Sequence, residues 1–259
     1  MAEWSTELSS VKQNEILVRG YPVEQLMEKA SYTDAVYLLF KGELPSAAES
    51  ALFAALLTSC VDHGVTPPSI HAAMNAASTG APLNAAVASG ILSINRFHGG
   101  AVEDAMELFA EAVTETGPSA DRVKIARFVE EGLAKGRRFP GYGHLNHTTD
   151  PRTVKLGELA RRHLTPAQRI YADAAFLIEE EMARLKGKKL PLNVDGMIGA
   201  LLLGLAFPPE LANGIFMISR VPGLIAHYVE ERRTQKPMRA IDPHAAQYAG
   251  RPKRNIDRP

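Results

Sequence analysis

The sequence of 259 residues predicts an all-α fold, and three observations support this prediction. Serine, threonine and aspartate residues that are followed by proline, or by an acidic or amide residue three positions on, recur along the chain as helix starts. Between them, apolar side chains recur at helical spacing, as in Val123, Ala126, Val129 and Leu133. Alternating runs rich in β-branched residues, which indicate strands, are scarce. We therefore expect ten or more helices joined by short connections.

The first expected helices lie in residues 19–45. A turn at residues 19–22 leads into a short helix, and a second helix begins at Ser31 or Thr33 and ends at Gly42. The next helix starts with a capping box, because Ser46 precedes Glu49 by three positions.

Later helix starts use similar devices. Thr165 and Gln168 have capping-box spacing, with a proline at the first helical position. Further plausible starts are Thr66–Pro67, Asp121 and Asp150–Pro151.

The longest apolar run, residues 197–207, is far shorter than the ~20 residues that span a bilayer. We expect it to form a buried helix, in which Gly199 and Gly204 permit close packing against another helix. From His244 the chain is polar, basic and proline-containing, which predicts a poorly ordered tail.

Composition and charge exclude several classes of function. Lys plus Arg equals Asp plus Glu, at 29 each, so no global field attracts nucleic acid or an anionic membrane, and an anionic ligand must be bound by local arginines. Cys60 is the only cysteine, which excludes an intrachain disulfide and a cysteine-based metal cluster and is typical of a reducing cytosol. The first residues lack the basic and apolar regions of a signal peptide. We expect a cytoplasmic protein.

Residues 141–152 contain two glycines, two histidines, an aspartate and an arginine. Glycines let the backbone approach a ligand closely, and a histidine on such a loop is displayed at a surface. The same residues are also compatible with a glycine-rich turn that ends in an aspartate N-cap. Taken alone, the loop leaves both interpretations open.

This loop is one of several blocks that together resemble the citrate synthase superfamily. In chain order the blocks contain an Arg-Gly-Tyr-Pro segment, an Asp-His segment, His-Gly-Gly-Ala, Pro-Gly-Tyr-Gly-His with Asp-Pro-Arg, Asn-Val-Asp, and Ser-Arg with Ala-His. The matching blocks are residues 19–45, 60–69, 77–101, 139–152, 191–199 and 213–231.

The resemblance implies a role for individual residues of this chain. Two histidines and an aspartate would be catalytic: His98, His144 and Asp195. Four residues would bind substrate carboxylates: His63, Arg152, Arg220 and Arg239. Arginine suits this task because its planar guanidinium meets a carboxylate through two hydrogen bonds and stays charged.

Coenzyme A contacts are implied less directly. Residues between His144 and Asp150 are uncharged apart from the contribution of His147, whereas the family commonly has basic residues and a longer spacing there. The residues expected to contact coenzyme A are therefore Gly141, Tyr142, Gly143, Arg137 and Arg138, with Arg251, Lys253 and Arg254 of the tail as substitutes. No metal and no bound cofactor is expected, since the coenzyme A thioester is itself substrate or product.

The implied chemistry makes or breaks a carbon–carbon bond next to a thioester carbonyl. In the synthetic direction Asp195 would remove the acetyl proton, His98 would donate to the thioester oxygen, and His144 would polarise the keto carbonyl. In the cleavage direction His144 would take the hydroxyl proton of the citryl group. A preorganised donor at such an oxyanion contributes about 3 kcal/mol.

The chain is shorter than ordinary citrate synthases. The sequences of residues 192–199 and 213–228 are more similar to those of citryl-CoA lyases, both stand-alone enzymes and the module within ATP-citrate lyases. We therefore expect cleavage of citryl-CoA to acetyl-CoA and oxaloacetate. The alternatives are a compact citrate or 2-methylcitrate synthase, favoured by the His98-Gly-Gly-Ala wording, and a non-catalytic relative that binds acyl-CoA or a dicarboxylate for regulation.

The resemblance also implies the domain organisation and the assembly. Residues 1–100 and 200–259 would form a large helical domain, and residues 101–199 a smaller one that carries His144 and Asp195 and closes over the ligand. Arg239 would reach the site of a partner subunit, so we expect a homodimer.

Overall fold

The computed structural model describes residues 4–117, 119–144, 147–239 and 249–250, and these form an almost entirely helical molecule. The prediction of an all-α fold is confirmed. The helices are α1 (Val23–Lys29), α2 (Tyr32–Lys41), α3 (Ala47–Ser59), α4 (Pro68–Ser78), α5 (Leu83–Leu92), α6 (Ala101–Thr116), α7 (Arg122–Ala134), α8 (Pro151–His163), α9 (Pro166–Lys186), α10 (Val194–Gly204), the 3₁₀ helix η1 (Pro209–Leu211) and α11 (Ala212–Thr234).

A small antiparallel sheet at the N-terminus was not foreseen. Its strands β1 (Ser9–Lys12), β2 (Glu15–Val18) and β3 (Tyr21–Pro22) lie in the order β1-β2-β3, with Ser9 opposite Val18 and Leu17 opposite Pro22. The sequence pattern indicates only a turn at residues 19–22. Because β1 is exposed along its whole length, these strands lack the buried apolar alternation that identifies a half-buried strand.

Most of the helix starts expected from the sequence are found at the predicted residues, where a side chain caps the helix. Ser31 forms a capping box with Asp34 and begins α2, which ends at a left-handed Gly42. The Ser46–Glu49 and Thr165–Gln168 boxes begin α3 and α9. Asp121 and Asp150 cap α7 and α8. The exception is α4, which begins one residue later than the Thr66–Pro67 prediction, after Pro67 and without a side-chain cap.

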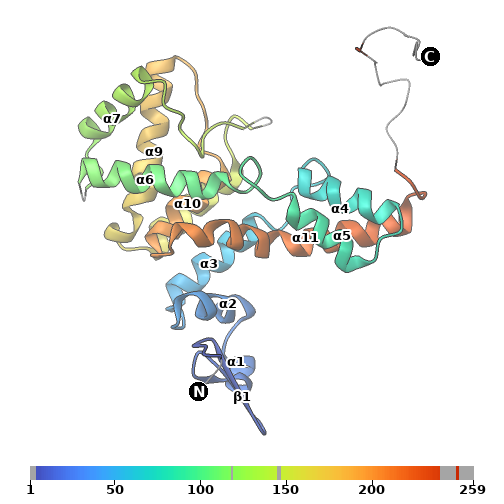
Figure 1. Ribbon diagram of the computed structural model, residues 1–259. Coiled ribbons are helices and arrows are strands. Elements are labelled where there is room, and N and C mark those ends of the chain that lie inside the picture. The colour runs from blue at the N-terminus through green and yellow to red at the C-terminus, as the bar shows by residue number, and fades with distance from the viewer. Residues whose placement is uncertain (1–3, 118, 145–146, 240–248, 251–259) are drawn as a thin grey trace, which may run out of the picture.

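Helix α10 packs against α6, α8 and α9, and it lies in the central part of this group of helices (Figure 1). Nearly all of its residues are buried, which confirms the predicted buried helix, although the helix begins at Val194 and ends before Phe207. A side chain at Gly199 would lie 3.0 Å from the carbonyl oxygen of Val102, and one at Gly204 would lie 2.4 Å from that of Gln168. Both glycines therefore permit close helix packing, as predicted.

Helix α11 extends from this central group of helices to α4 and α5, which pack on its C-terminal half (Figure 1). The main buried cluster runs from Val36 to Phe216 and includes residues of α6, α9 and α10. A second, small cluster joins α4 to α11 through Ile70, Ala73, Met74 and Leu224. The division of the chain at residues 100 and 199 into two domains stays a prediction.

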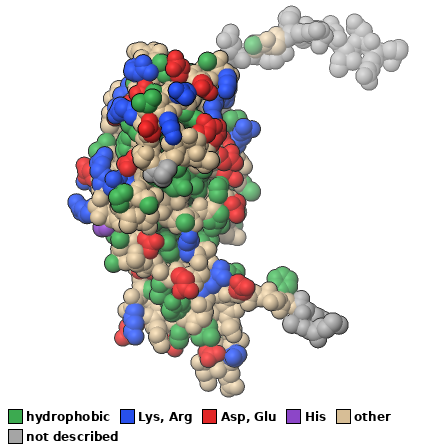
Figure 2. Space-filling model, turned by 90° about the vertical axis from the view of Figure 1, so that its left-hand side faces the viewer, with side chains coloured by type: hydrophobic (Ala, Val, Ile, Leu, Met, Phe, Trp, Pro, Cys, Tyr) green, Lys and Arg blue, Asp and Glu red, His purple; other side chains and the backbone are tan. Residues whose placement is uncertain are grey.

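On the face shown in Figure 2, acidic and basic side chains are interspersed. Within the described residues, no helix is both long enough and apolar enough to cross a membrane. The predicted tail from His244, including Arg251, Lys253 and Arg254, lies outside the described residues except for residues 249–250.

Candidate active site

Six of the seven residues expected to act on the substrate line one cavity of about 530 Å³. They come from segments far apart in the sequence, which the helices bring together. The six are His63, His98, His144, Arg152, Asp195 and Arg220. Other residues of the lining are Cys60, Thr66, Pro67, Pro68, Phe97, Gly143, Asn193, Val194 and Phe216.

His98 lies between α5 and α6 and is fixed from two sides. Its Nε2 atom is 2.8 Å from the hydroxyl of Ser69, a fully buried residue in the first turn of α4. Its ring meets that of Phe216 edge to face, with 5.7 Å between the ring centroids. Burial and the nearby charge of Arg220 lower the pKa of His98 to about 4, so the imidazole is neutral at neutral pH.

The segments that carry His144 and Asp195 are joined by main-chain hydrogen bonds. The amide of Asn193 donates to the carbonyl of Gly141 at 2.9 Å, and the amide of Gly143 donates to the carbonyl of Pro191 at 2.8 Å. The side-chain amide of Asn193 donates to the carbonyl of Gly143 at 2.9 Å. The loop before His144 and the start of α10 therefore form one unit.

A close contact between two glycines allows this pairing. A side chain at Gly196 would lie 2.6 Å from the carbonyl oxygen of Gly141, and Gly141 has a φ of +85°. Any larger residue at either position would push the loop away from α10. The contact joins the two segments that carry His144 and Asp195, both of which line the cavity.

Asp195 lies in the first turn of α10 and lines the cavity. Burial raises the pKa of its carboxyl group, while the charges of Arg152 and Arg220 oppose that rise. A carboxyl group with a raised pKa holds a proton at a higher pH than an ordinary aspartate, which suits a group that exchanges a proton with carbon.

Arg152, in the first turn of α8, is held by the buried Asp150 that caps the same helix. Its Nε and Nη2 atoms donate to the two carboxylate oxygens of Asp150 at 3.0 and 2.8 Å. Burial opposes ionisation of Asp150, but the hydrogen bonds and charge of Arg152 lower the pKa of this carboxyl group overall. The pair therefore presents a fixed guanidinium to the cavity.

Arg220 is buried in α11, and its Nε atom donates to the carbonyl of Cys60 at 2.9 Å. Its Nη1 atom is buried without a hydrogen-bond partner among the described residues. A buried charged donor without a partner is costly, so the site is suited to an anion that would accept from it.

His63 is half-buried and lies beside two other histidines. Its ring centroid is 5.9 Å from that of His144 and 6.5 Å from that of His147. Burial lowers the pKa of His63, and the charges of Arg152, His144 and Arg220 contribute in the same direction. The ring of His147 lies 4.4 Å from that of His144, and its amide donates to Nδ1 of His144 at 3.2 Å.

Arg239 lies outside this cavity. It follows α11, and it pairs with the buried Glu231 through its Nε and Nη2 atoms, at 3.0 and 2.5 Å. Its amide donates to the hydroxyl of Ser78 at 3.2 Å, at the end of α4.

Among the described residues that are expected to contact coenzyme A, only Gly143 lines the first cavity. Arg137, Arg138 and Tyr142 border a second cavity of about 710 Å³, which shares Phe97 with the first. The guanidinium of Arg137 is bound by the carboxylate of Glu111, and the hydroxyl of Tyr142 donates to the carbonyl of Ala175 at 2.7 Å. Arg138 is exposed.

Several residues of the site were not singled out from the sequence. Ser69, Asn193 and Phe216 act through contacts between segments far apart in the chain, which no local pattern reveals. Phe97 gave a weak signal, because a phenylalanine beside His98 is ordinary in a core, yet this side chain is 91% exposed. Among the described residues, no group of histidine, cysteine, aspartate or glutamate side chains is arranged to hold a metal ion.

Comparison with known proteins adds to this geometry. A family model described as "Citrate synthase, C-terminal domain" matches residues 1–59 and 49–241. The structure of citryl-CoA lyase from Hydrogenobacter thermophilus is 39% identical, with a TM-score of 0.88 and coverage of 98% of this chain and 97% of that one.

Two longer proteins are also similar. The structure of ATP citrate lyase from Methanothrix soehngenii in complex with citrate and coenzyme A is 26% identical, with a TM-score of 0.86 and coverage of 98% of this chain and 42% of that one. A probable ATP-citrate synthase of Dictyostelium discoideum is 32% identical over 255 residues, which are 90% of this chain and 39% of that protein. The chain thus spans about two fifths of the length of this curated relative.

Proposed function

This chain belongs to the citrate synthase family, and we propose that it is a citryl-CoA lyase that cleaves citryl-CoA to acetyl-CoA and oxaloacetate. The observation that carries the proposal is the cavity in which three histidines, two arginines and one aspartate meet. The similarity to a citryl-CoA lyase along nearly the full length of both chains supports it.

The arginines give the cavity its preference for carboxylates. Arg220 has a buried Nη1 atom that can donate to a carboxylate, and the paired Asp150 fixes the orientation of Arg152. Two guanidinium groups with His63 suit a di- or tricarboxylate better than a simple keto acid.

In the cleavage step, His144, His98 and Asp195 each accept or donate a proton or a hydrogen bond. His144 takes the hydroxyl proton of the citryl group, the carbon–carbon bond breaks, and its electron pair moves into the thioester as an enolate. His98 donates to the enolate oxygen, and Asp195 delivers a proton to the carbon, giving acetyl-CoA. Solvent then restores the proton on Asp195 and removes that on His144.

The hydrogen bond between His147 and His144 bears on this step. A ring nitrogen that accepts from an amide carries no proton, so neutral His144 has its lone pair on Nδ1 and its proton on Nε2. Proton uptake at Nδ1 therefore requires the amide of His147 to move away. Protonation of His144 and the position of this loop are coupled.

Cys60 lines the same cavity but takes no part in this chemistry. Burial and the neighbouring Asp195 raise the pKa of its thiol to about 12. The thiol is therefore protonated at neutral pH and a poor nucleophile, so an acyl group on Cys60 is not a step of the reaction.

Coenzyme A would extend from the first cavity past Phe97 into the second. Arg96, Arg138 and Lys186 border the second cavity and can face the phosphates of the coenzyme. Arg137 is bound by Glu111 and stacks near Phe128, with 5.0 Å from its Cζ atom to the ring centroid, so we assign it a structural role. Tyr142 also borders the second cavity and can contact the coenzyme there, whereas Gly141 borders neither cavity and shapes the loop through its contact with Gly196.

We also propose that the protein is a cytoplasmic homodimer. In a dimer, Arg239 of one subunit would complete the carboxylate site of the other. In this structure the guanidinium of Arg239 is paired with the buried Glu231 of α11, which fixes its orientation.

The function is tested with a coupled assay. Purified protein is mixed with citryl-CoA, malate dehydrogenase and NADH, and cleavage releases oxaloacetate, which oxidises NADH. We expect oxidation with the wild-type protein and none with Asp195→Asn, which removes the proton donor. If the wild-type protein gives no oxidation while a known lyase does, the proposal is wrong.

The reverse reaction tests the second candidate, a compact citrate or 2-methylcitrate synthase, which the His98-Gly-Gly-Ala motif favours. Acyl-CoA and oxaloacetate would then release free thiol, because a synthase also hydrolyses the thioester. A lyase leaves citryl-CoA intact.

A further inference from the structure

The loop that carries His63 lies along one face of α11, and three successive loop residues contact three successive turns of that helix. The carbonyl of Cys60 accepts from Arg220, the carbonyl of Val61 lies against Gly223, and the carboxylate of Asp62 accepts from His227. Positions 220, 223 and 227 share one helix face because their spacings are three and four residues. The next loop residue, His63, enters the candidate active site.

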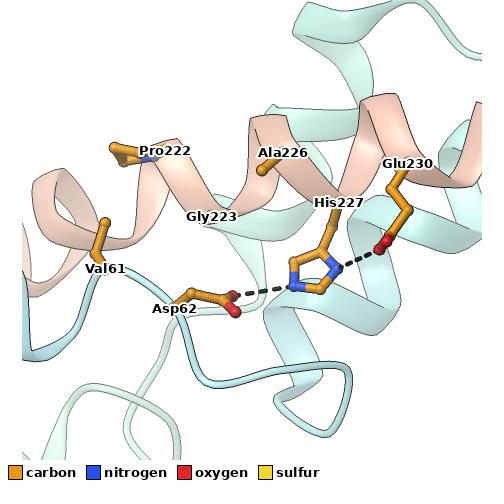
Figure 3. A pocket seen from close by; sticks show the side chains of 7 residues that line it. All are labelled: Val61, Asp62, Pro222, Gly223, Ala226, His227 and Glu230. Carbon is orange, nitrogen blue, oxygen red and sulfur yellow. Dashed lines mark hydrogen bonds and ion pairs between the residues drawn. The ribbon is translucent and has the colours of Figure 1, made fainter.

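Gly223 makes the close approach possible. A side chain at this position would lie 2.4 Å from the carbonyl oxygen of Val61 and 3.0 Å from Oδ1 of Asp62. Gly223 follows Pro222, which lies inside α11 (Figure 3). At this turn, the loop therefore packs directly against the main chain of α11.

Asp62 and His227 form the outermost contact of the series. Nε2 of His227 is 3.0 Å from Oδ1 of Asp62, and Oδ2 of Asp62 accepts from the amide of Gly64 at 3.0 Å. The Asp62 carboxylate therefore links α11 to both sides of His63 in the chain. Burial opposes ionisation of Asp62, yet the amide of Gly64 and the charge of His227 lower the pKa of this carboxyl group overall.

Figure 3 shows that the His227 ring lies between Asp62 and Glu230. The Nδ1 atom of His227 is 3.8 Å from Oε2 of Glu230, whose side chain is 68% exposed, compared with 11% for His227. The closer and less exposed contact is the one with Asp62, so Glu230 serves as a matched control for the opposite side of the same ring.

We propose that His227 is a positioning residue for the substrate site, which acts through Asp62 to hold His63 against Arg152 and Arg220. That His63 binds a substrate carboxylate rests on the proposed function. That His227 and Asp62 position His63 does not depend on that function. The two parts therefore require separate measurements.

The position of His63 is measured without substrate. In protein with ¹⁵N-labelled histidine, a His63→Gln variant assigns the His63 imidazole signal, which is then titrated. We expect His227→Leu to raise the pKa of His63 towards its ordinary value, because the ring moves away from the arginines and into water. His227→Gln, whose amide can still donate to Asp62, should restore most of the lowered pKa, and Glu230→Gln should leave it unchanged.

Ligand binding is then measured with oxaloacetate by calorimetry. We expect His227→Leu and Asp62→Asn each to weaken binding by about tenfold, which corresponds to the loss of one net hydrogen bond. If His227 acts through His63, then His227→Leu adds little in a His63→Ala background. A general loss of stability would weaken binding equally in both backgrounds.

The two measurements fail independently. An unchanged His63 pKa in both His227→Leu and the milder Asp62→Asn variant, each folded by circular dichroism, overturns the positioning role. Additive losses in the two backgrounds also overturn it. If wild-type protein binds no oxaloacetate, the proposed function is wrong, and the titration alone still decides whether His227 positions His63.

Discussion

At the scale of single residues, the environment of His98 decides how it can act. The ring is neutral because burial and Arg220 lower its pKa to about 4, so it can donate only the single proton of one tautomer. If the hydroxyl of Ser69 donates to Nε2, the proton lies on Nδ1. Ser69 would then select the tautomer that donates to the thioester oxygen.

We therefore expect Ser69→Ala to lower kcat by about tenfold to a hundredfold with a smaller change in KM, because the donor matters most when charge develops on the oxygen. The measurement is steady-state kinetics with citryl-CoA. Ser89→Ala is the control, since within the described part of the chain the hydroxyl of this serine donates to the carbonyl of Ala86 in its own helix. A change confined to KM would show that Ser69 serves ground-state binding instead.

The paired Asp150 and Arg152 also act at the residue scale, and they predict a pH dependence. Asn is a good N-cap, so Asp150→Asn keeps the cap of α8 but removes the charge. We expect a loss of about 2 kcal/mol in the free energy of unfolding at neutral pH, since the side chain of Asp150 is fully buried and bonds a charged group.

The sign of this dependence follows from the lowered pKa of Asp150. The stabilisation is complete above the unfolded-state pKa of about 3.9 and is lost as the pH falls through the lower folded-state value. Urea unfolding at several pH values should show the two proteins converging in acid. A constant difference at all pH values would mean that the charge of Asp150 is not the cause.

At the scale of elements, the site depends on how two segments approach each other. The loop before His144 pairs with the start of α10 only because Gly141 meets Gly196 without side chains. Here packing restricts the choice of residue more than helix propensity does, since Gly196 lies inside a helix where alanine is intrinsically better.

Gly196→Ala should accordingly reduce turnover severely and cost about 1–3 kcal/mol of stability, because its side chain would lie 2.6 Å from a carbonyl oxygen. The matched control is Gly214→Ala in α11, where a side chain meets no atom within 4 Å. That change should be neutral or stabilise by about 0.5–1 kcal/mol. Thermal unfolding and the coupled assay measure both, and equal activity of the two variants would contradict the role of the glycine contact.

At the scale of the whole molecule, the position of Arg239 argues for a shared site. It is the one expected carboxylate ligand outside the cavity, and it lies where the end of α11 meets the end of α4. In a two-fold dimer each subunit would give Arg239 and receive its partner's.

Mixing two inactive variants tests this arrangement. Asp195→Asn and Arg239→Ala, unfolded and refolded together, should form mixed dimers with one intact site each, and random pairing should restore about a quarter of wild-type activity. Each variant refolded alone is the control. If the mixture is no more active than its components, Arg239 is not shared.

The sequence by itself determined the helical class, most helix starts and the chemical character of the site. Capping boxes such as Ser46 with Glu49 and apolar spacing are local, so they can be recognised without the fold. The resemblance also identified the six residues that the structure brings to one cavity. The N-terminal strands were not predicted, because they are largely exposed and show no periodic pattern of buried apolar residues.

Only the tertiary structure decided how these residues are held. The hydrogen bond between Ser69 and His98, the contact of Gly141 with Gly196 and the hydrogen bond between Asp62 and His227 each join segments far apart in the chain. Their effects are burial, excluded volume and fixed orientation, which depend on distance in space. No pattern along the sequence encodes that distance. The types of residue in the site could therefore be predicted from the sequence, whereas the contacts that position them could not.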